Sequence, residues 1–421
     1  MISRRAFLEA TGAATLAGPS VWGSAPEQGR RKRVAIVTTV WRYLSHAQHM
    51  GDRLLVGYPH NGQWHRPPMD VVSLYVDQKP DGDLSEARAR EFGFHVYPTI
   101  AEALRNGGEK LAVDGVVIIG EHGDYPNNEK GQKLYPRYKF FRQVVEVFEQ
   151  EGRAVPVFND KHLSYSFSQA TQMVQASRRL KFSLLAGSSL PVTWRLPSIE
   201  LPLDCTIDDV LMVGFGSLEA YGFHGLEALQ CMVERRRSGE TGVKAVQLLE
   251  GDAVWKAGEQ GRWSRRLLEA ALSRTDSLQG LTLKDARPQD LANNDQLPQI
   301  VKDPAAFVIE YADGLRAVML MLNGAITDFT FAARLRGVPE IQSTQFLLPP
   351  TPNVTYSACL MGKVEELIQT GRAPYRVERT QLVSGILESC LESRFKQHQR
   401  LQTPHLNVQY WPPAESQFCR T

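Results

Sequence analysis

Short apolar runs alternate with amphipathic segments along the first half of the chain. The runs suited to buried strands lie at residues 34–37, 71–76, 93–97, 113–120, 154–158 and 182–186. The segments with helical spacing lie between them, at 86–92, 100–104, 138–150 and 168–179. This alternation predicts βαβ units, and therefore an N-terminal Rossmann-like domain with a doubly wound parallel sheet over residues 31–192.

The second half of the chain has a different pattern. Strand-like runs occur at 210–213, 245–249, 306–310, 317–321 and 324–333, and Asp313-Gly314 between two of them is a hairpin signal. We therefore expect an α+β domain over 193–350, built on an open, mostly antiparallel sheet. Helical stretches at 356–368 and 380–397, within a C-terminal part of 351–421, are expected to pack back on the core. The polar segment 279–304 is predicted to be a loop.

Composition and charge exclude several classes of protein. Hydrophobic residues make up 43% of the 421 residues and charged residues 22%, which is typical of a soluble globular protein and not of a disordered, fibrous or polytopic membrane protein. The net charge of +2 produces no global field for a polyanion, so no nucleic-acid partner is expected. The cysteines form no CxxC pair and are widely scattered, at Cys205, Cys231, Cys359, Cys390 and Cys419. A zinc knuckle or a dense disulfide framework is therefore not expected.

The N-terminus resembles a twin-arginine export signal. Arg4 and Arg5 lie within the motif at 3–8, and the weakly apolar stretch 10–21 that follows is too short to span a bilayer stably. Small residues at 23–25 form a candidate cleavage region. We therefore expect residues 1–30 to be a signal and linker, and the protein to be exported folded, to the periplasm or the exterior, with no membrane insertion after signal removal. A cytoplasmic tail with a chance arginine pair is the alternative.

The densest polar cluster follows the predicted central strand. In an open α/β sheet, ligands bind beyond the carboxyl ends of the strands, so Glu121, His122 and Asp124 are candidate catalytic residues, and Tyr125 and Arg137 are candidate substrate contacts. His122 has the side chain best suited to acid–base work near neutral pH. The alternative interpretation is a solvated turn whose charges pair with one another.

Two further clusters end the next strands. Asp160, Lys161 and His162 follow residues 154–158, and a lysine beside a carboxylate and a histidine can hold a substrate hydroxyl. Alternatively, Lys161 caps a helix or loop carbonyl. Arg195 follows residues 187–191 and is a candidate ligand for a sugar or a carboxylate, although a structural role also fits this segment.

The helical segment that begins near Tyr221 carries another group of candidates. Tyr221, His224 and Glu227 are spaced so that they share one side of a helix, with Gln230 one turn further on. The alternative for His224 is a buried structural histidine.

These motifs, in this order, resemble the Gfo/Idh/MocA family of oxidoreductases. The stretch 91–97 followed by 100–104 is similar to the family's second Rossmann crossover, Asp160-Lys161 stands at its Glu-Lys-Pro motif, and 222–227 resembles its Asp-x-Gly-x-His-x-x-Asp pattern. The resemblance implies NAD or NADP as cofactor, a sugar or polyol as substrate, and a homo-oligomer formed through the exposed face of the C-terminal sheet. It also implies that Lys161 positions or deprotonates a hydroxyl group and that His224 relays the proton.

The sequence departs from this family at the nucleotide site. No GxGxxG follows the first strand, because residues 38–46 hold β-branched and aromatic side chains and no glycine occurs before Gly51. Thr38, Thr39 and Asp77 remain candidate cofactor contacts, since Asp77 ends the second strand where an acid can hold a ribose hydroxyl. Arg42 and His46 stand where the phosphate loop belongs, and either bind an anion or fill the site. At the two motifs, His162 replaces the proline and Ala220 replaces an acid. Four histidines of this region are predicted to lie on the surfaces of helices and loops. They are His46, His49, His60 and His65.

Three hypotheses follow. The first is an exported oxidoreductase that acts on a sugar, glycoside or polyol with NAD(P) held by non-standard contacts. The second is a carbohydrate hydrolase or lyase on the same fold, cofactor-independent or metal-assisted, with the nucleotide site lost. The third is a non-catalytic periplasmic sugar-binding protein. No HxH or HExxH spacing is present, so a metal is not expected.

Overall fold

The computed structural model describes residues 30–277 and 296–420. The predicted twin-arginine signal lies outside the described residues, and so does most of the predicted loop at 279–304. Within the described ranges, no helix combines the length and the apolar composition needed to cross a membrane.

The first sheet consists of six parallel strands, in the order β5-β4-β1-β6-β7-β8. Their bounds are β1 (Lys32–Thr38), β4 (Met69–Val76), β5 (His95–Tyr97), β6 (Gly115–Ile119), β7 (Val157–Asp160) and β8 (Leu184–Gly187). Strands β1 and β6 are buried on both faces of the sheet. A strand buried in this way has a continuous apolar run in the sequence, which is why the runs predict a parallel sheet. The Rossmann-like prediction is confirmed.

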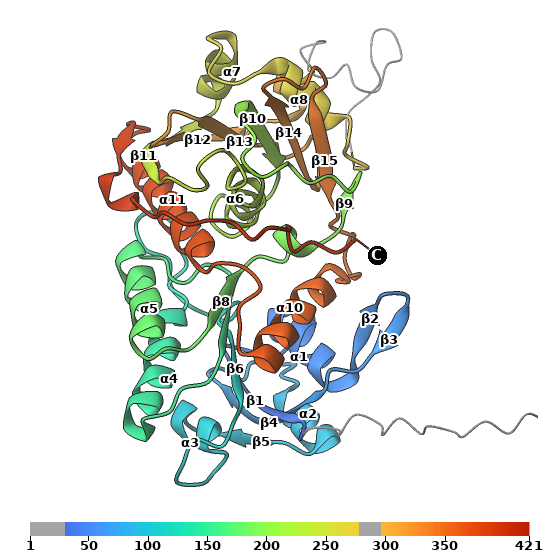
Figure 1. The fold of residues 1–421 in the computed structure, drawn as a ribbon, viewed down its shortest axis with the longest axis vertical. Coiled ribbons are helices and arrows are strands. Elements are labelled where there is room, and N and C mark those ends of the chain that lie inside the picture. The colour runs from blue at the N-terminus through green and yellow to red at the C-terminus, as the bar shows by residue number, and fades with distance from the viewer. Residues whose placement is uncertain (1–29, 278–295, 421) are drawn as a thin grey trace, which may run out of the picture. The chain divides into compact units, whose positions relative to one another are not determined.

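Helices cover both faces of this sheet (Figure 1). One face packs against α3 (Ile100–Arg105), α4 (Arg137–Glu151) and α5 (Phe167–Arg179). The other face packs against α1 (His46–Val56), α2 (Ser85–Phe92) and α10 (Tyr356–Thr370). Helix α10 therefore completes the core of the first sheet although it lies close to the C-terminus of the chain.

The second sheet has eight strands, in the order β16-β11-β12-β13-β10-β14-β15-β9. Their bounds are β9 (Arg195–Leu196), β10 (Ile207–Gly214), β11 (Val243–Glu250), β12 (Ala305–Tyr311), β13 (Arg316–Met321), β14 (Phe329–Leu335), β15 (Gln342–Phe346) and β16 (Leu401–Gln402). Only the β10–β13 pair among these is parallel, so the prediction of a mostly antiparallel sheet is confirmed. Strands β12 and β13 form the hairpin predicted from Asp313-Gly314, and Gly314 has the positive φ of 95° that this turn requires.

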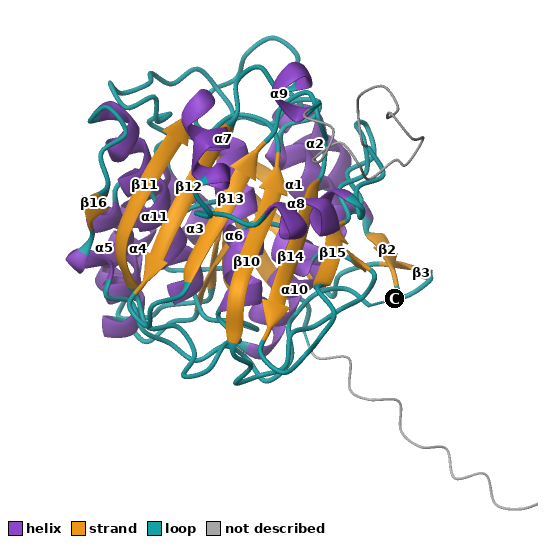
Figure 2. Ribbon diagram, turned by 90° about the horizontal axis from the view of Figure 1, so that it is seen from above, coloured by secondary structure: helices purple, strands orange, loops and turns teal. Residues whose placement is uncertain are grey.

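Both faces of the second sheet carry helices. The face toward the first sheet packs against α6 (Ala220–Val233) and α11 (Glu378–Phe395). Helices α7 (Asp252–Glu259), α8 (Arg265–Leu272) and α9 (Leu297–Ile300) pack on part of the opposite face, as Figure 2 shows for α7 and α8. The sequence predicts that this opposite face of the second sheet is open, whereas in the structure helices cover part of it.

Several local predictions differ from the structure. The strand predicted at 324–333 begins only at Phe329, because Gly324 lies in a turn with φ of 96° that brings it against the Ile300 carbonyl. Helix α9 lies inside the segment predicted to be a loop. The hairpin of β2 (Tyr58–His60) and β3 (Gln63–His65) has too short a pattern to be found from hydrophobic periodicity.

Candidate active site

The carboxyl ends of β6, β7 and β8 deliver polar side chains to one cavity of about 380 Å³. Helix α6 faces these strand ends across the cavity. Six of the predicted site residues line it, at Glu121, His122, Asp160, Lys161, Tyr221 and His224. The parallel sheet is the reason for this convergence, because its strands all end at the same edge.

Lys161 and His224 form the closest polar contact of the cavity. Lys161 Nζ lies 2.5 Å from His224 Nε2, and Ser188 Oγ makes a hydrogen bond with the other ring nitrogen, Nδ1. Burial, and then the charge of Lys161, hold the pKa of His224 well below its usual range. The imidazole is therefore neutral and links Ser188 to Lys161 in one hydrogen-bonded chain.

Glu121 lies beside Lys161 and holds its amine in place. Arg137 donates a hydrogen bond to one oxygen of Glu121, and Lys161 Nζ lies 3.7 Å from the other oxygen. Burial opposes the charged form of Glu121, but Lys161 and Arg137 outweigh it and hold the pKa of this carboxyl well below its usual range. Glu121 is thus an ionised anchor for Lys161, and its low pKa makes it unsuitable as a proton donor at neutral pH.

His46 and His49 are not surface residues, contrary to the prediction. His46 Nδ1 lies 2.6 Å from Asp160 Oδ2, and His49 is 9% exposed. Burial first, and then His46, lower the pKa of His49 to about 3 and that of His122 to about 4. The two histidines lie inside the protein because the polar first turn of α1 packs over the ends of β6 and β7. His60 lies exposed, as predicted.

Two of the polar residues that line the cavity have left-handed backbone conformations. His122 has a φ of 71° and Lys161 a φ of 66°. Such conformations are uncommon for residues other than glycine, and they cluster at functional sites when the surrounding structure holds them in place. Lys161 follows β7 directly and His122 lies three positions after the end of β6, and both side chains line the cavity.

Several predicted contacts lie away from the cavity. Asp124 is exposed, and Arg195 is buried elsewhere, with its guanidinium 4.1 Å from the centre of the Phe418 ring. Glu227 is fully buried and accepts a hydrogen bond from the backbone of Ser188. These three side chains cannot contact a ligand in this cavity.

Arg137 and His162 lie behind the cavity wall. Both are buried, and Arg137 Nη1 is 3.1 Å from His162 Nε2. Burial and the Arg137 charge hold the pKa of His162 well below its usual range, so it is a neutral acceptor for Arg137. Their role is to position Glu121 and not to bind substrate.

The turn that would hold a dinucleotide is occupied by the chain itself. Trp41 is fully buried and lies so close to α1 that a Cβ at Gly51 would come within 2.5 Å of its ring. Ser45 caps the helix, and the Leu44 N–H donates to Gln48 Oε1 at 2.6 Å. The N–H groups of Leu44, Ser45 and His46, at the start of the helix where an anion would bind, therefore already have partners.

The predicted cofactor residues are also committed to contacts within the chain. The hydroxyl groups of Thr38 and Thr39 donate to backbone carbonyls at the end of β6, at 2.9 and 2.7 Å. Asp77 accepts from Tyr75 on one oxygen and from Tyr125 on the other, both at 2.7 Å. All three side chains therefore already have hydrogen-bond partners within the chain.

The loops after β1, β4 and β6 are also joined to one another across the crevice. The Gln78 amide exchanges two hydrogen bonds with the backbone of Asp124, at 2.8 and 3.0 Å, and the Gln78 N–H donates to Thr39 at 2.8 Å. The residues present therefore do not fit a dinucleotide in the Rossmann position. Within residues 30–277 and 296–420, no group of three His, Cys, Asp or Glu side chains is placed to hold a metal ion.

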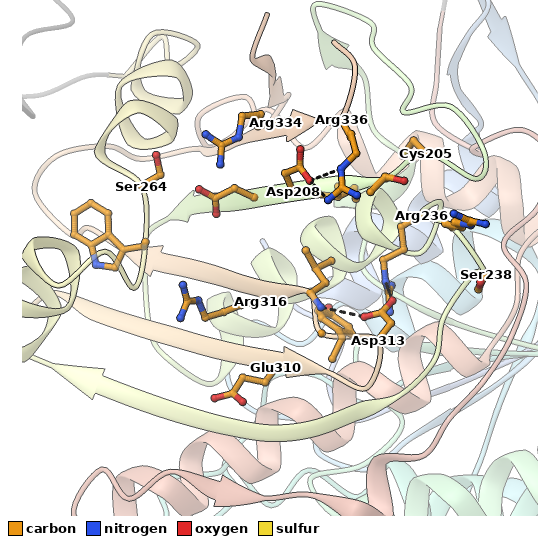
Figure 3. A pocket seen from close by; sticks show the side chains of 18 of the residues that line it. Cys205, Asp208, Arg236, Ser238, Ser264, Glu310, Asp313, Arg316, Arg334 and Arg336 are labelled. Carbon is orange, nitrogen blue, oxygen red and sulfur yellow. Dashed lines mark hydrogen bonds and ion pairs between the residues drawn. The ribbon is translucent and has the colours of Figure 1, made fainter. Parts of the chain in front are cut away.

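A second and larger hollow, of about 1080 Å³, lies over the second sheet (Figure 3). Arg336 pairs with Asp208 at 2.7 Å there, and Arg236 pairs with Asp313 at 2.6 Å. Its lining carries six basic and four acidic side chains. The lysine–histidine contact makes the smaller cavity the candidate active site.

Solved structures match this architecture over most of its length. GenD2 from gentamicin A biosynthesis, solved in complex with NAD, aligns with a TM-score of 0.55 over 93% of this chain and 99% of its own, at 15% identity. Myo-inositol dehydrogenase from Lactobacillus casei, in complex with NAD(H) and myo-inositol, aligns with a TM-score of 0.51 over 91% and 99%, at 10% identity. This is the fold of the Gfo/Idh/MocA oxidoreductases.

The scyllo-inositol dehydrogenase of L. casei shares the Gfo/Idh/MocA fold with this chain as well, with a TM-score of 0.50 over 89% of this chain and 98% of its own, at 9% identity. No family model matches the sequence, and no curated protein matches it significantly. This chain is thus similar to these proteins in its fold, at low sequence identity.

Sequence reasoning missed part of the cavity. His46 enters from α1, and Tyr356 and Ser357 enter from α10. Burial raises the pKa of Tyr356 to about 12, so its hydroxyl is a hydrogen-bond donor at neutral pH. The unusual Ser45-His46 pair at the expected phosphate loop was a usable signal for His46, whereas no local pattern places α10 beside the first sheet.

Proposed function

We propose that this protein is a redox-neutral enzyme that transfers protons on a carbohydrate or polyol, as a lyase or hydrolase that works without a dinucleotide. One observation carries the proposal. The Lys161–His224 contact opens into a cavity of about 380 Å³, while the adjoining turn after β1 lacks glycine, buries Trp41 against α1 and is hydrogen-bonded to the loop after β4, which in turn bonds the loop after β6. Acid–base groups are present, whereas the turn that would bind a hydride-accepting dinucleotide is hydrogen-bonded within the chain.

The size and polarity of the cavity support a sugar-sized substrate. Pockets for small ligands begin at about 300 Å³ and use a few convergent polar groups to orient the ligand. In this cavity those groups are carboxylate, amine, imidazole and hydroxyl, all able to bond sugar hydroxyls. The fold neighbour from L. casei solved with myo-inositol supports the same substrate class.

Lys161 is the residue that we expect to touch the reacting oxygen or proton. Ser188 and His224 hold and move a proton at Lys161 Nζ, because the neutral imidazole joins the two groups. Glu121 fixes the position of the amine, and Arg137 fixes Glu121. Tyr221 and Tyr356 are available to bond substrate hydroxyls from the opposite wall.

The oxidoreductase reaction is the second candidate, and the fold shared with NAD-bound proteins favours it. The test is mass spectrometry of small molecules released from freshly purified, denatured protein, together with thermal shifts in excess NAD and NADP. We expect no dinucleotide and no shift. Stoichiometric NAD(P), or a clear shift, would overturn the redox-neutral proposal and establish the second candidate.

The positive test is turnover of a panel of glycosides, keto sugars, uronates and inositols, followed by NMR and mass spectrometry in D₂O. We expect dehydration, isomerisation or hydrolysis with one class of substrate, and a loss of at least about 100-fold in Lys161→Met. Lys110→Met, at an exposed lysine away from the cavity, is the matched control. Equal turnover by both variants would remove Lys161 from the mechanism.

We propose further that the protein is exported by the twin-arginine route, on the strength of Arg4, Arg5 and the apolar stretch after them. Replacement of both arginines by lysine should retain the protein in the cytoplasm of a host with this pathway. Unchanged export of the variant would contradict the proposal.

A further inference from the structure

His46 forms an oriented acid–base pair with Asp160. His46 is the first residue of α1, and its Nδ1 lies 2.6 Å from Asp160 Oδ2 at the end of β7. With Asp160 as the acceptor, Nδ1 carries a proton, and in the neutral ring Nε2 bears the lone pair. The His46 side chain is 18% exposed and lines the cavity, while that of Asp160 is 2% exposed. A buried acid thus aligns an imidazole whose second nitrogen makes no hydrogen bond to the described residues.

The surroundings of His46 hold it in this position. Ser45 caps the helix through the Gln48 N–H, and the His46 N–H donates to His122 Nδ1 at 3.4 Å. The rings of His122 and His49 lie with their centres 5.1 and 5.8 Å from the centre of the His46 ring. The imidazole is therefore held by its backbone, its Nδ1 partner and its ring neighbours.

The cavity thereby contains two separate proton-transfer groups. Lys161 is joined to His224 and Ser188, which come from α6 and from the turn after β8. His46 is joined to Asp160 and comes from the turn after β1. The two groups share the cavity and no hydrogen bond that the structure records links them. A single proton relay would not require the second pair.

We propose that His46 is a second catalytic acid–base residue, oriented by Asp160, which acts together with Lys161 on opposite sides of one substrate. This inference rests on the proposed function and deepens it. The pair suits a sugar with a C–H bond beside a carbonyl or carboxylate group, such as a keto sugar or a uronate. The turn that binds phosphate in a dinucleotide enzyme would here supply a catalytic side chain.

The step balances without an oxidant or a reductant. One of the two groups takes the proton from carbon, and the electron pair of the C–H bond moves into an enolate. The enolate then expels the oxygen on the neighbouring β-carbon as the C–O bond breaks, and the other group protonates that oxygen. The products are an unsaturated sugar and water or an alcohol. The group that acts as base gains one proton and the group that acts as acid loses one, and exchange with solvent restores both.

The first test needs no substrate. Diethyl pyrocarbonate modifies imidazole nitrogens that are unprotonated and accessible, and peptide mass spectrometry locates the product. We expect His46 to react in the native protein, with His95, an exposed histidine on β5, as the internal reference. In Asp160→Asn we expect the His46 rate to change at least threefold relative to His95. A native His46 that fails to react, or reacts identically in the variant, would overturn the oriented pair.

The second test uses the sugar panel in D₂O. His46→Ala should lose at least about 100-fold in kcat, and free imidazole should restore part of it, as a purely structural role would not allow. Asp160→Asn should lower kcat with little change in KM, as expected of a positioning residue. His95→Ala is the matched control and should keep wild-type activity.

The outcomes separate the two ideas. If Lys161→Met is inactive while His46→Ala retains full activity, the inference about His46 fails and the proposed function stands. If the wild-type protein turns over no member of the panel, the proposed function fails for that panel. The diethyl pyrocarbonate result then decides whether the His46–Asp160 pair exists as described.

Discussion

At the scale of the residue, Glu227 shows how burial governs charge beside the site. Its carboxyl lies so close to Gly187 that a Cβ there would come within 2.6 Å of Oε2, and it accepts from the Ser188 N–H. Burial raises the pKa of Glu227 to about 7, against 4.5 for the ordinary carboxyl. Glu227 is therefore a protonated structural group over much of the acid range, and not a substrate ligand.

This shift predicts a pH dependence of stability. The folded state holds a proton that the unfolded chain releases near pH 4.5, so the contribution is full below that value and is lost as the pH rises through about 7. In urea unfolding, we expect wild type to lose roughly 3 kcal/mol relative to Glu227→Gln between pH 5 and pH 8.5. Glu129→Gln, at an exposed carboxyl, should track wild type. Parallel pH profiles for wild type and Glu227→Gln would contradict the raised pKa.

At the scale of the element, α1 depends on its contact with Trp41. The helix contains Gly51 where the indole ring fills the space that a side chain would need, with 2.5 Å between a built Cβ and the ring. Glycine in a helix interior ordinarily costs about 1 kcal/mol relative to alanine. Its presence is explained by the close approach of Trp41, whose buried ring also stacks on Phe94.

Two glycine replacements test this contact. Gly51→Ala should destabilise the protein by about 1–3 kcal/mol, because the overlap with Trp41 outweighs the gain in helix propensity. Gly362→Ala on α10 should instead stabilise by up to about 1 kcal/mol, since its Cβ would meet only the Tyr58 hydroxyl at 3.8 Å. Urea unfolding of both variants measures the difference. Equal effects of the same sign would show that the ring does not press on α1.

At the scale of the whole described chain, a buried ion pair joins three distant segments. Arg379 on α11 makes two hydrogen bonds to Glu234, which ends α6, at 2.9 and 2.5 Å. Tyr410, in the C-terminal segment, donates to the same carboxylate at 2.7 Å. All three side chains are buried, with the arginine also stacked on Tyr375 at 4.6 Å. The pair fixes how α11 and the C-terminal segment close over α6.

We expect Arg379→Met or Glu234→Met alone to cost about 3–5 kcal/mol, because each leaves one charge buried without its partner. The double variant should cost less than the sum of the two, which a double-mutant cycle in urea measures. The exposed pair Arg142 and Glu146, at 3.1 Å, is the control and should give less than about 1 kcal/mol. Additive losses at the buried pair would show that the two charges do not depend on each other.

Local patterns determined much of this protein. Apolar runs and helical spacing predicted both sheets, because burial on one or both faces leaves a period of two, or an unbroken run, in the sequence. Lys161 and the polar group after β6 could be placed at one site because parallel strands end at a common edge, whereas only the family resemblance placed His224 opposite Lys161. The absence of glycine in residues 38–46 already indicated that the nucleotide turn is unusual.

Only the tertiary structure showed which contacts the turn after β1 makes in place of a glycine-rich nucleotide loop. His46 meets Asp160 across 114 positions of sequence, and α10 packs beside β1 although more than 300 positions separate them. Contacts of this kind leave no periodic signal, since either partner alone is also typical of a surface residue. Whether Asp124 or Arg195 faces the cavity likewise depends on the direction of a side chain after the chain has folded. The sequence determined the architecture and the two residues of the relay, and long-range packing determined which other side chains share their cavity.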